Sequence, residues 1–282
     1  MKKITYRELI FCFFMISQCF SCQQLRFYYE LSYLPCVKCT EKNTKIDVLS
    51  VLDSKSVFQS YEQLQRDSIF IDNNEKRKIY GIDGDIGDLM IKRVNHTYII
   101  SKNYQTKELQ FKDIVGNEGT LKYIEKEKLK WELESVKDSI NGYLCQKATT
   151  SFGGRIWNAW FTTEIAIQDG PYKFWGLPGL IVKISDEKNE YNWKLIANKK
   201  IDSNNLQEIN FMDYQGFDIT NTTKEKFNKL IKQYEKNPMG DIRDHIEDRD
   251  MEGEKSIREA ENRMLKYYKD NNNPIEIEII KK

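Results

Sequence analysis

Short segments rich in β-branched and aromatic residues follow one another through most of the sequence, and they constrain the fold more than any other feature. Several alternate apolar with polar residues, which is typical of strands in a sheet with one solvated face. Gly153-Gly154 separates two of them and is a strong signal for a two-residue hairpin. Short connections between consecutive strands favour antiparallel pairing. The expected strands are 27–33, 46–52, 56–61, 97–101, 108–113, 120–125, 129–134, 143–152, 155–163, 180–185 and 191–197.

Helical periodicity appears only late in the chain. Residues 227–234 carry apolar side chains at helical spacing, and Thr222 and Glu225 have the spacing of a capping box. Residues 257–268 trace a second amphipathic helix, and residues 275–280 alternate apolar residues with glutamate, as a terminal strand would. The charged residues 240–254 between them are expected to be a solvated, weakly ordered insert.

The pattern as a whole predicts one α+β domain over residues 22–282. Its main element is a predominantly antiparallel β-sheet, which we expect to be curved by analogy with other β-rich proteins. The C-terminal amphipathic helices back this sheet, and the terminal strand joins it.

The N-terminus has the pattern of a secretory signal peptide over residues 1–21. A basic start is followed by an apolar run over 9–16, and the small residues Cys19 and Ser21 are placed for cleavage before Cys22. Cys22 is also a candidate for lipid attachment, although Cys19 and Phe20 depart from the usual lipoprotein pattern. Both routes predict the same cut and an exported protein, either periplasmic or associated with the outer membrane.

Charge and hydropathy exclude some classes of partner and topology. The full chain has 44 Lys+Arg and 43 Asp+Glu, and without residues 1–21 the numbers are 41 and 42. This balance lacks the basic excess that nucleic-acid binding requires. No later run reaches the ~18 to 20 apolar residues that a membrane span needs, so we expect a mature chain that is not integral to the membrane.

Three more cysteines follow Cys22 in the sequence: Cys36, Cys39 and Cys145. Cys36 and Cys39 flank two residues in a polar stretch, and a small loop disulfide between them is the favoured interpretation. Alternatives are pairing of Cys145 with one of the two, free thiols, a zinc site completed from Cys145, His96 and His245, and a redox motif. Zinc would need two more soft ligands, and the redox motif would need a βαβ unit, so we predict no metal and no cofactor.

Residues 170–181 (GPYKFWGLPGLI) concentrate glycine, proline and aromatic residues. Pro178 and Gly179 suit the two central positions of a type II turn, in which the glycine has positive φ. One interpretation is a fold-defining turn whose aromatic side chains close one end of the core. The other is an aromatic lip of a ligand-binding or partner-binding groove. The motif turn comprises Gly176, Leu177, Pro178, Gly179, Leu180 and Ile181.

The strand 155–163 adds further candidates for ligand binding. Arg155 and Trp157 share one face of this strand, and Trp160 lies on the other. The arginine could hold an anionic group, or it could pair with an acidic neighbour and stack on an aromatic ring, which we favour. The full set of ligand-binding candidates is Arg155, Trp157, Trp160, Tyr172, Lys173, Phe174 and Trp175.

Five motifs occur in an order that resembles the GLPGLI family (Porph_ging-type domain), a group of exported proteins from Bacteroidetes-type bacteria. They are residues 142–149 (GYLCQKAT), 154–155 leading to 159–162 (AWFT), 170–174 (GPYKF), 176–181 (GLPGLI) and 272–276 (NNPIE). The resemblance implies export and a shape. It implies no activity, because none is established for the family.

No catalytic constellation is recognisable in the sequence. His96 and His245 lie in polar surroundings, and the carboxylates of residues 83–88 lack the full spacing of a calcium loop. We therefore expect a non-enzymatic envelope protein that holds a lipid, a peptide or a small apolar ligand in the concavity of the sheet, in an aromatic pocket near Trp160 and Trp175. The alternative is an accessory module that docks on an outer-membrane transporter or another envelope partner through an apolar patch or an edge strand.

Overall fold

A single sheet of twelve strands organises the protein. The computed structural model describes residues 24–69, 97–126, 128–201, 219–240, 243 and 251–277. The sheet has the order β12-β6-β5-β4-β3-β2-β1-β11-β10-β9-β8-β7. Its strands are β1 (Gln24–Tyr33), β2 (Asn43–Val51), β3 (Lys55–Ser60), β4 (Ile99–Asn103), β5 (Glu108–Ile114), β6 (Thr120–Glu125), β7 (Glu132–Ile140), β8 (Tyr143–Phe152), β9 (Arg155–Thr162), β10 (Leu180–Asp186), β11 (Tyr191–Ile201) and β12 (Ile219–Asn221).

The predicted α+β fold with a mainly antiparallel sheet is confirmed, because among the described strands only β12 and β6 pair in parallel. Strands β1–β6 are joined in chain order, as are β7–β11, which agrees with the expected hairpins. The two runs meet where β1 pairs with β11, in a register that places Leu31 opposite Trp193. Gly153 and Gly154 form the predicted two-residue hairpin between β8 and β9, both with positive φ (61° and 79°).

Several sequence-based boundaries were wrong. The strand expected at 129–134 is β7, which begins only at Glu132 and runs to Ile140. Residues 275–277, expected to start a terminal strand, have no strand structure. Residues 251–254, expected in a charged loop, form the first turn of helix α7 (Met251–Asp270). The helix at residues 61–69 and the short strand β12 were not predicted.

Some predictions lie outside the described residues. These are the signal peptide, Cys22, residues 83–88, His96, His245 and most of the charged insert between α5 (Lys224–Lys236) and α7.

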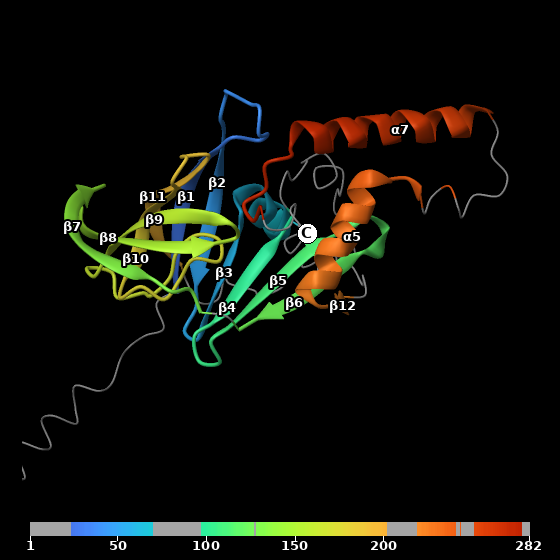
Figure 1. Ribbon diagram of the computed structural model, residues 1–282. Coiled ribbons are helices and arrows are strands. Elements are labelled where there is room, and N and C mark those ends of the chain that lie inside the picture. Colours follow the sequence, from blue (N-terminus) through green and yellow to red (C-terminus); the bar gives the residue numbers. More distant parts are fainter. Residues whose placement is uncertain are drawn as a thin grey trace, which may run out of the picture.

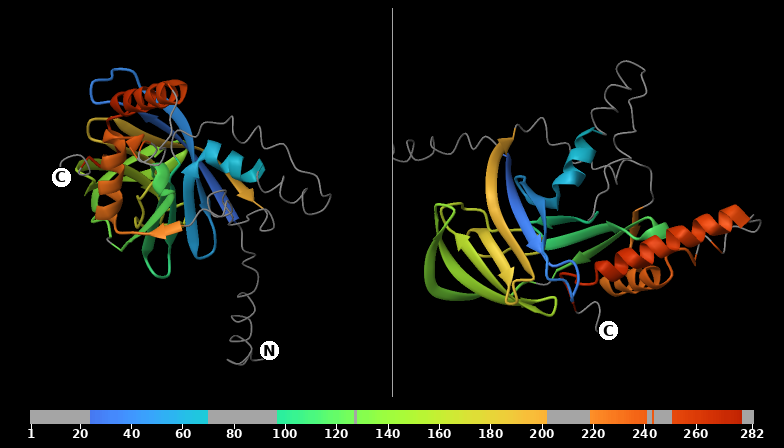
Figure 2. Two further views of the ribbon diagram at one scale, coloured as in Figure 1. Left: turned by 90° about the vertical axis from the view of Figure 1, so that its right-hand side faces the viewer. Right: turned by 90° about the horizontal axis from the view of Figure 1, so that it is seen from above.

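The sheet curls strongly, and the two C-terminal helices gather at one end of it. Figure 1 shows β7–β10 curving round at one end, with α5 beside β6 and β12 at the other. The view from above in Figure 2 shows α7 next to α5 on that same side. Phe227 anchors α5, because its ring meets the rings of Tyr123 and Phe111 edge to face at 5.1 and 5.5 Å. Thr223 caps the helix by accepting a hydrogen bond from the backbone N–H of Lys226, so the cap is one residue later than expected.

The segment between β9 and β10, residues 163–179, packs against the core-facing side of the curved sheet. The ring of Phe174 lies 4.6 Å from that of Trp157 on β9, and Tyr172 stacks on Trp193 of β11 at 6.2 Å. The hydroxyl of Tyr29 on β1 donates a hydrogen bond to the carbonyl oxygen of Ile181 (2.8 Å). The protein's own chain therefore occupies this part of the sheet's concavity.

The glycines of the GLPGLI motif have roles other than the one predicted. The prediction of a type II turn centred on Pro178 and Gly179 was wrong, because Gly179 does not have positive φ. Positive φ occurs instead at Gly176 (91°). Gly179 is required by a close approach of two backbones, since a Cβ there would lie 2.0 Å from the carbonyl oxygen of Thr162. The glycine thus allows the backbone at the start of β10 to lie in close contact with the backbone at the end of β9.

Gly179→Ala is expected to destabilise the protein more than Gly176→Ala. The first substitution forces the paired backbones apart, with a cost of about 3 kcal/mol. The second meets no neighbour within 4 Å and adds only left-handed strain, about 1 to 2 kcal/mol. Urea unfolding of the two variants measures both losses. Equal stability of the two would show that the backbone contact at Gly179 is unimportant.

Candidate functional site

Asp169 anchors the segment 163–179 inside the sheet. Its carboxylate accepts hydrogen bonds from Lys102 Nζ (2.6 Å), Ser56 Oγ (2.5 Å), Tyr104 Oη (2.6 Å) and the backbone N–H of Gly170 (2.6 Å). The side chains of Lys102 and Asp169 are completely buried. Burial lowers the pKa of Lys102, and the carboxylate of Asp169 opposes this shift. Strand β4 thereby holds the segment by a buried ion pair, and β3 holds it by a hydrogen bond from Ser56.

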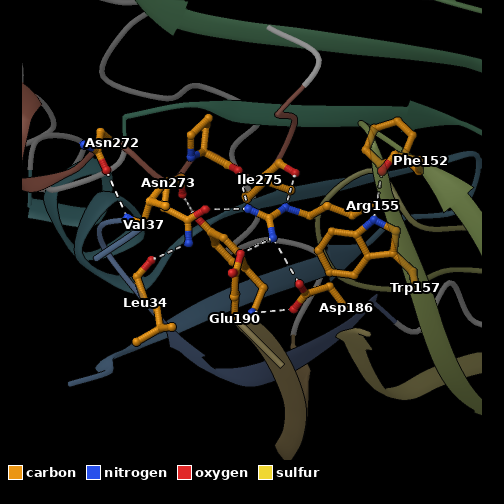
Figure 3. A network of polar contacts seen from close by, with 12 residues as sticks. Leu34, Val37, Phe152, Arg155, Trp157, Asp186, Glu190, Asn272, Asn273 and Ile275 are labelled. Carbon is orange, nitrogen blue, oxygen red and sulfur yellow. Dashed lines mark hydrogen bonds and ion pairs between the residues drawn. The ribbon is translucent and has the colours of Figure 1, made fainter. Parts of the chain in front are cut away.

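Arg155 clamps the C-terminal segment, residues 271–277, against the sheet. Its guanidinium donates to Asp186 (3.0 Å), to Glu190 (2.6 Å) and to the side-chain oxygen of Asn273 (2.6 Å), as Figure 3 shows. It also donates to the backbone oxygens of residues 274 and 275, and it lies 5.1 Å above the ring of Tyr191. Every guanidinium nitrogen is engaged within the protein, which is the structural role that the sequence favoured for Arg155.

Lys173 and Lys224 form a second clamp around Glu276. Lys173 Nζ lies 2.6 Å from Glu276 and 3.0 Å from Glu125, and Lys224 Nζ lies 2.8 Å from each of these carboxylates. The hydroxyl of Tyr172 donates a further hydrogen bond to Glu276 (2.7 Å). Burial by itself would raise the pKa of Glu276, but the two lysines outweigh it and lower this pKa to about 2.

The β1–β2 loop holds the same segment from a third side. The backbone N–H of Val37 donates to the side-chain oxygen of Asn272 (3.0 Å), and Asn273 donates to the carbonyl oxygens of Leu34 and Pro35. A disulfide joins Cys36 to Cys39 within this loop. Of the cysteine arrangements considered, the structure contains this loop disulfide.

Cys145 is a free, buried thiol. Burial raises its pKa to about 11, so it is a poor nucleophile near neutral pH. Among the described residues, no cluster of three or more metal-ligating side chains occurs. In the same part of the chain, none of the helices has the length and apolar character to span a membrane.

Most of the predicted ligand-binding residues are core residues. Trp157 and Phe174 have no exposed surface, and Lys173 and Tyr172 are almost fully enclosed. Trp175 is 8% exposed, and its carbonyl oxygen accepts a hydrogen bond from Trp131. Trp160 is half-buried on the other face of β9. Of the two interpretations of residues 170–181, the burial of these side chains fits the favoured one, a turn whose aromatic residues close one end of the core, and does not fit an exposed aromatic lip.

Two open grooves lie at the helical end of the sheet instead. The larger, which we call the α5 groove, has a volume of about 1130 Å³ and lies between β6, the strand-to-helix connection and α5. The second, of about 820 Å³, lies along the β8–β9 hairpin. Lys224 and Glu276 line both. The α5 groove is lined by Lys122, Tyr123, Ile124, Glu125, Lys126, Asn221, Thr222, Thr223, Lys224, Glu225, Asn228, Lys229, Lys232, Gln233, Lys236 and Glu276.

Sequence reasoning missed the α5 groove. Its lysines come from β6 and α5, which are separated by about a hundred residues. In the sequence, the lysines of each element alone resemble those of an ordinary solvent-exposed face. The recurrence of Lys229, Lys232 and Lys236 at helical spacing was the one available signal.

Comparison with known proteins supports the fold and one motif region. Residues 154–183 match the model of a family described as "Protein of unknown function (Porph_ging)", which confirms the predicted resemblance for this segment. The match spans β9, the segment 163–179, of which residues 169–175 are buried, and the start of β10, so it includes the residues that close the core. No curated protein matches the chain.

Two solved structures share the fold. PNGF-II in the P21 space group has a TM-score of 0.53 at 16% identity, with 75% of this chain and 33% of that chain covered. PNGF-II in the C2 space group has a TM-score of 0.52 at 17% identity, with the same coverage. The chain thus spans about a third of the length of these structures, and at this identity the similarity concerns the fold alone.

Glu276→Gln is expected to lower stability at neutral pH and to flatten its acid dependence. The pKa of Glu276 is about 2 in the folded protein and 4.5 in the reference state. Because the folded value is the lower one, its contribution is complete above pH ~4.5 and is lost as the pH falls towards ~2. That contribution is on the order of 3 kcal/mol. Urea unfolding of both proteins between pH 2 and 7 measures it, and parallel pH profiles would contradict this role.

Arg155→Lys is expected to loosen the C-terminal segment while the sheet stays folded. Lysine keeps the charge but cannot make the same set of hydrogen bonds, so we expect a loss of about 2 kcal/mol. Hydrogen exchange should accelerate at the amide of Asn273, which bonds to Pro35. Unchanged exchange at that amide would mean that the β1–β2 loop and the lysines around Glu276 hold the segment without Arg155.

Proposed function

We propose that this protein is an exported, non-enzymatic envelope protein that binds a ligand in the α5 groove. The observation that carries the proposal is the groove itself. Its volume of about 1130 Å³ is slightly above the usual range for ligand sites, about 300 to 1000 Å³, so it has room for a ligand. The core-facing residues 172–174 fill the place where the sequence led us to expect a ligand.

The export part of the proposal rests on the N-terminal sequence pattern, with its basic start, apolar run and small residues before Cys22. The non-enzymatic part rests on the chemistry of the groove. Its lining offers lysines, glutamates and amides, and the buried Glu276 is held ionised by two lysines, which leaves it unsuited to act as an acid near neutral pH.

A second candidate function is docking of an envelope partner on the opposite edge of the sheet. Strand β7 is the last strand in the sheet order, and its outer edge is open among the described strands. Leu133 and Val136 on this strand are about half exposed (55% and 49%). Exposed apolar side chains on an edge strand are typical of a surface that pairs with another chain.

Substitution of one lysine on α5 tests the groove. Lys229 and Lys226 are both exposed on this helix, but only Lys229 lines the groove. We expect Lys229→Trp to fill the groove and Lys226→Trp to serve as the matched control. Each tagged protein is purified from its native envelope, and mass spectrometry identifies what is retained. We expect a molecule retained by the wild type and by K226W to be at least tenfold depleted from K229W.

Equal retention by all three proteins would exclude the α5 groove as the binding site. In that case Leu133→Glu combined with Val136→Glu tests the docking alternative. Loss of a co-purifying protein from this variant, with the fold intact by circular dichroism, would favour the β7 edge.

A further inference from the structure

The outer edge of β6 is only partly covered. Strand β12 pairs with β6 in parallel over Thr120, Leu121 and Lys122, and then the chain turns into α5. The last bond between the two is donated by the backbone N–H of Thr222 to the carbonyl oxygen of Lys122 (2.8 Å). Beyond Lys122, no other described strand follows on that side of β6.

Ile124 therefore presents open backbone groups to the α5 groove. In a strand, residues two apart direct their N–H and C=O to the same edge. Lys122 directs its carbonyl towards β12, so Ile124 directs both of its groups outward past the end of β12. No described residue forms a hydrogen bond with these outward groups. Its side chain is 54% exposed and lines the groove.

The groove beside this edge has an excess of positive charge, because its lining includes six lysines and three glutamates (Glu125, Glu225 and Glu276). Lys224 is neutralised by Glu125 and Glu276, and Lys126 pairs with Glu108. Lys122, Lys229 and Lys236 also line the groove, and within the described part of the chain they form no ion pair. Two of them, Lys229 and Lys236, belong to α5, whereas Ile124 belongs to β6. An occupant of the groove thus meets backbone donors and acceptors on one wall and ammonium groups on the other.

From this juxtaposition we infer that the α5 groove takes an extended acidic peptide segment of a partner protein, which adds as a strand to β6 beyond the end of β12. The inference rests on the proposed function and names the ligand class. The peptide backbone pairs with Ile124, and acidic side chains at alternate positions point towards Lys229 and Lys236.

Two features favour a peptide over other anionic ligands. An acidic glycan or a lipid headgroup would satisfy the lysines, but neither reproduces the alternating N–H and C=O groups that an open strand edge pairs with. The concave shape also fits a chain better than it fits a flat membrane surface. The β7 edge lacks this combination, because none of the described grooves runs along it with lysines on the facing wall.

A displayed library of random decapeptides tests the inference on the mature full-length protein. We expect selected peptides to carry Asp or Glu at alternate positions. A synthetic copy of the most enriched peptide is then measured by fluorescence anisotropy. Its affinity should fall at least tenfold for Ile124→Pro, because proline removes the outward N–H and is tolerated on an edge strand. It should fall similarly for K229E/K236E and stay unchanged for the control K226E/K266E, which reverses two exposed lysines outside the groove.

Three outcomes would overturn the inference. If the selected peptides lack acidic residues, the lysines of the groove do not select the ligand. If the peptide binds Ile124→Pro with the same affinity as the wild type, it does not add as a strand to β6. Binding of tetragalacturonate or of phosphatidylglycerol vesicles, lost in K229E/K236E while no peptide is selected, assigns the groove to another anion and leaves the proposed function standing. The proposed function fails separately, if the molecule retained from the native envelope stays bound to K229W.

Discussion

The buried pair between Lys102 and Asp169 is the interaction on which the interior depends. A curved sheet with aromatic residues on its inner face would be open to water unless something filled it. Asp169 fixes the segment 163–179 to β3 and β4. Further along this segment, the ring of Tyr172 contacts Trp193 on β11, and the ring of Phe174 contacts Trp157 on β9. Burying two charges costs desolvation free energy, so such a pair contributes more to placing the chain than to net stability.

The same segment then positions the C-terminal residues. Lys173 belongs to the segment 163–179 and pairs with Glu276, so the C-terminal segment 271–277 is attached to the residues that fill the core. Arg155 and the β1–β2 loop add two independent attachments. The family-model match over residues 154–183 includes Arg155 and Lys173. Lys224 belongs to both this clamp and the α5 groove, which connects the rigid interior to the surface where we propose binding.

Local features of the fold could be predicted from the sequence, and long-range ones could not. Gly153-Gly154 predicted a hairpin because both of its residues must adopt positive φ, which is a property of a few adjacent residues. The pairing of β1 with β11 joins residues more than 150 positions apart, and nothing in either strand specifies its partner. Gly179 was assigned the wrong role for the same reason, since the atom that excludes a side chain there belongs to Thr162. The α5 groove was missed because its walls come from separate parts of the chain.

The pairing of β1 with β11 also has a consequence for biogenesis. One edge of β1 pairs with β2, which follows it directly in the chain, but the partner of its other edge is β11, which ends only at Ile201. Among strands β1–β11, the pairing of β1 with β11 therefore joins the strands that lie farthest apart in the chain. Sequence-distant pairing of this kind folds slowly and leaves a strand edge open to other chains in the meantime. A chain in which β11 has not yet reached β1 therefore exposes this strand edge to other chains.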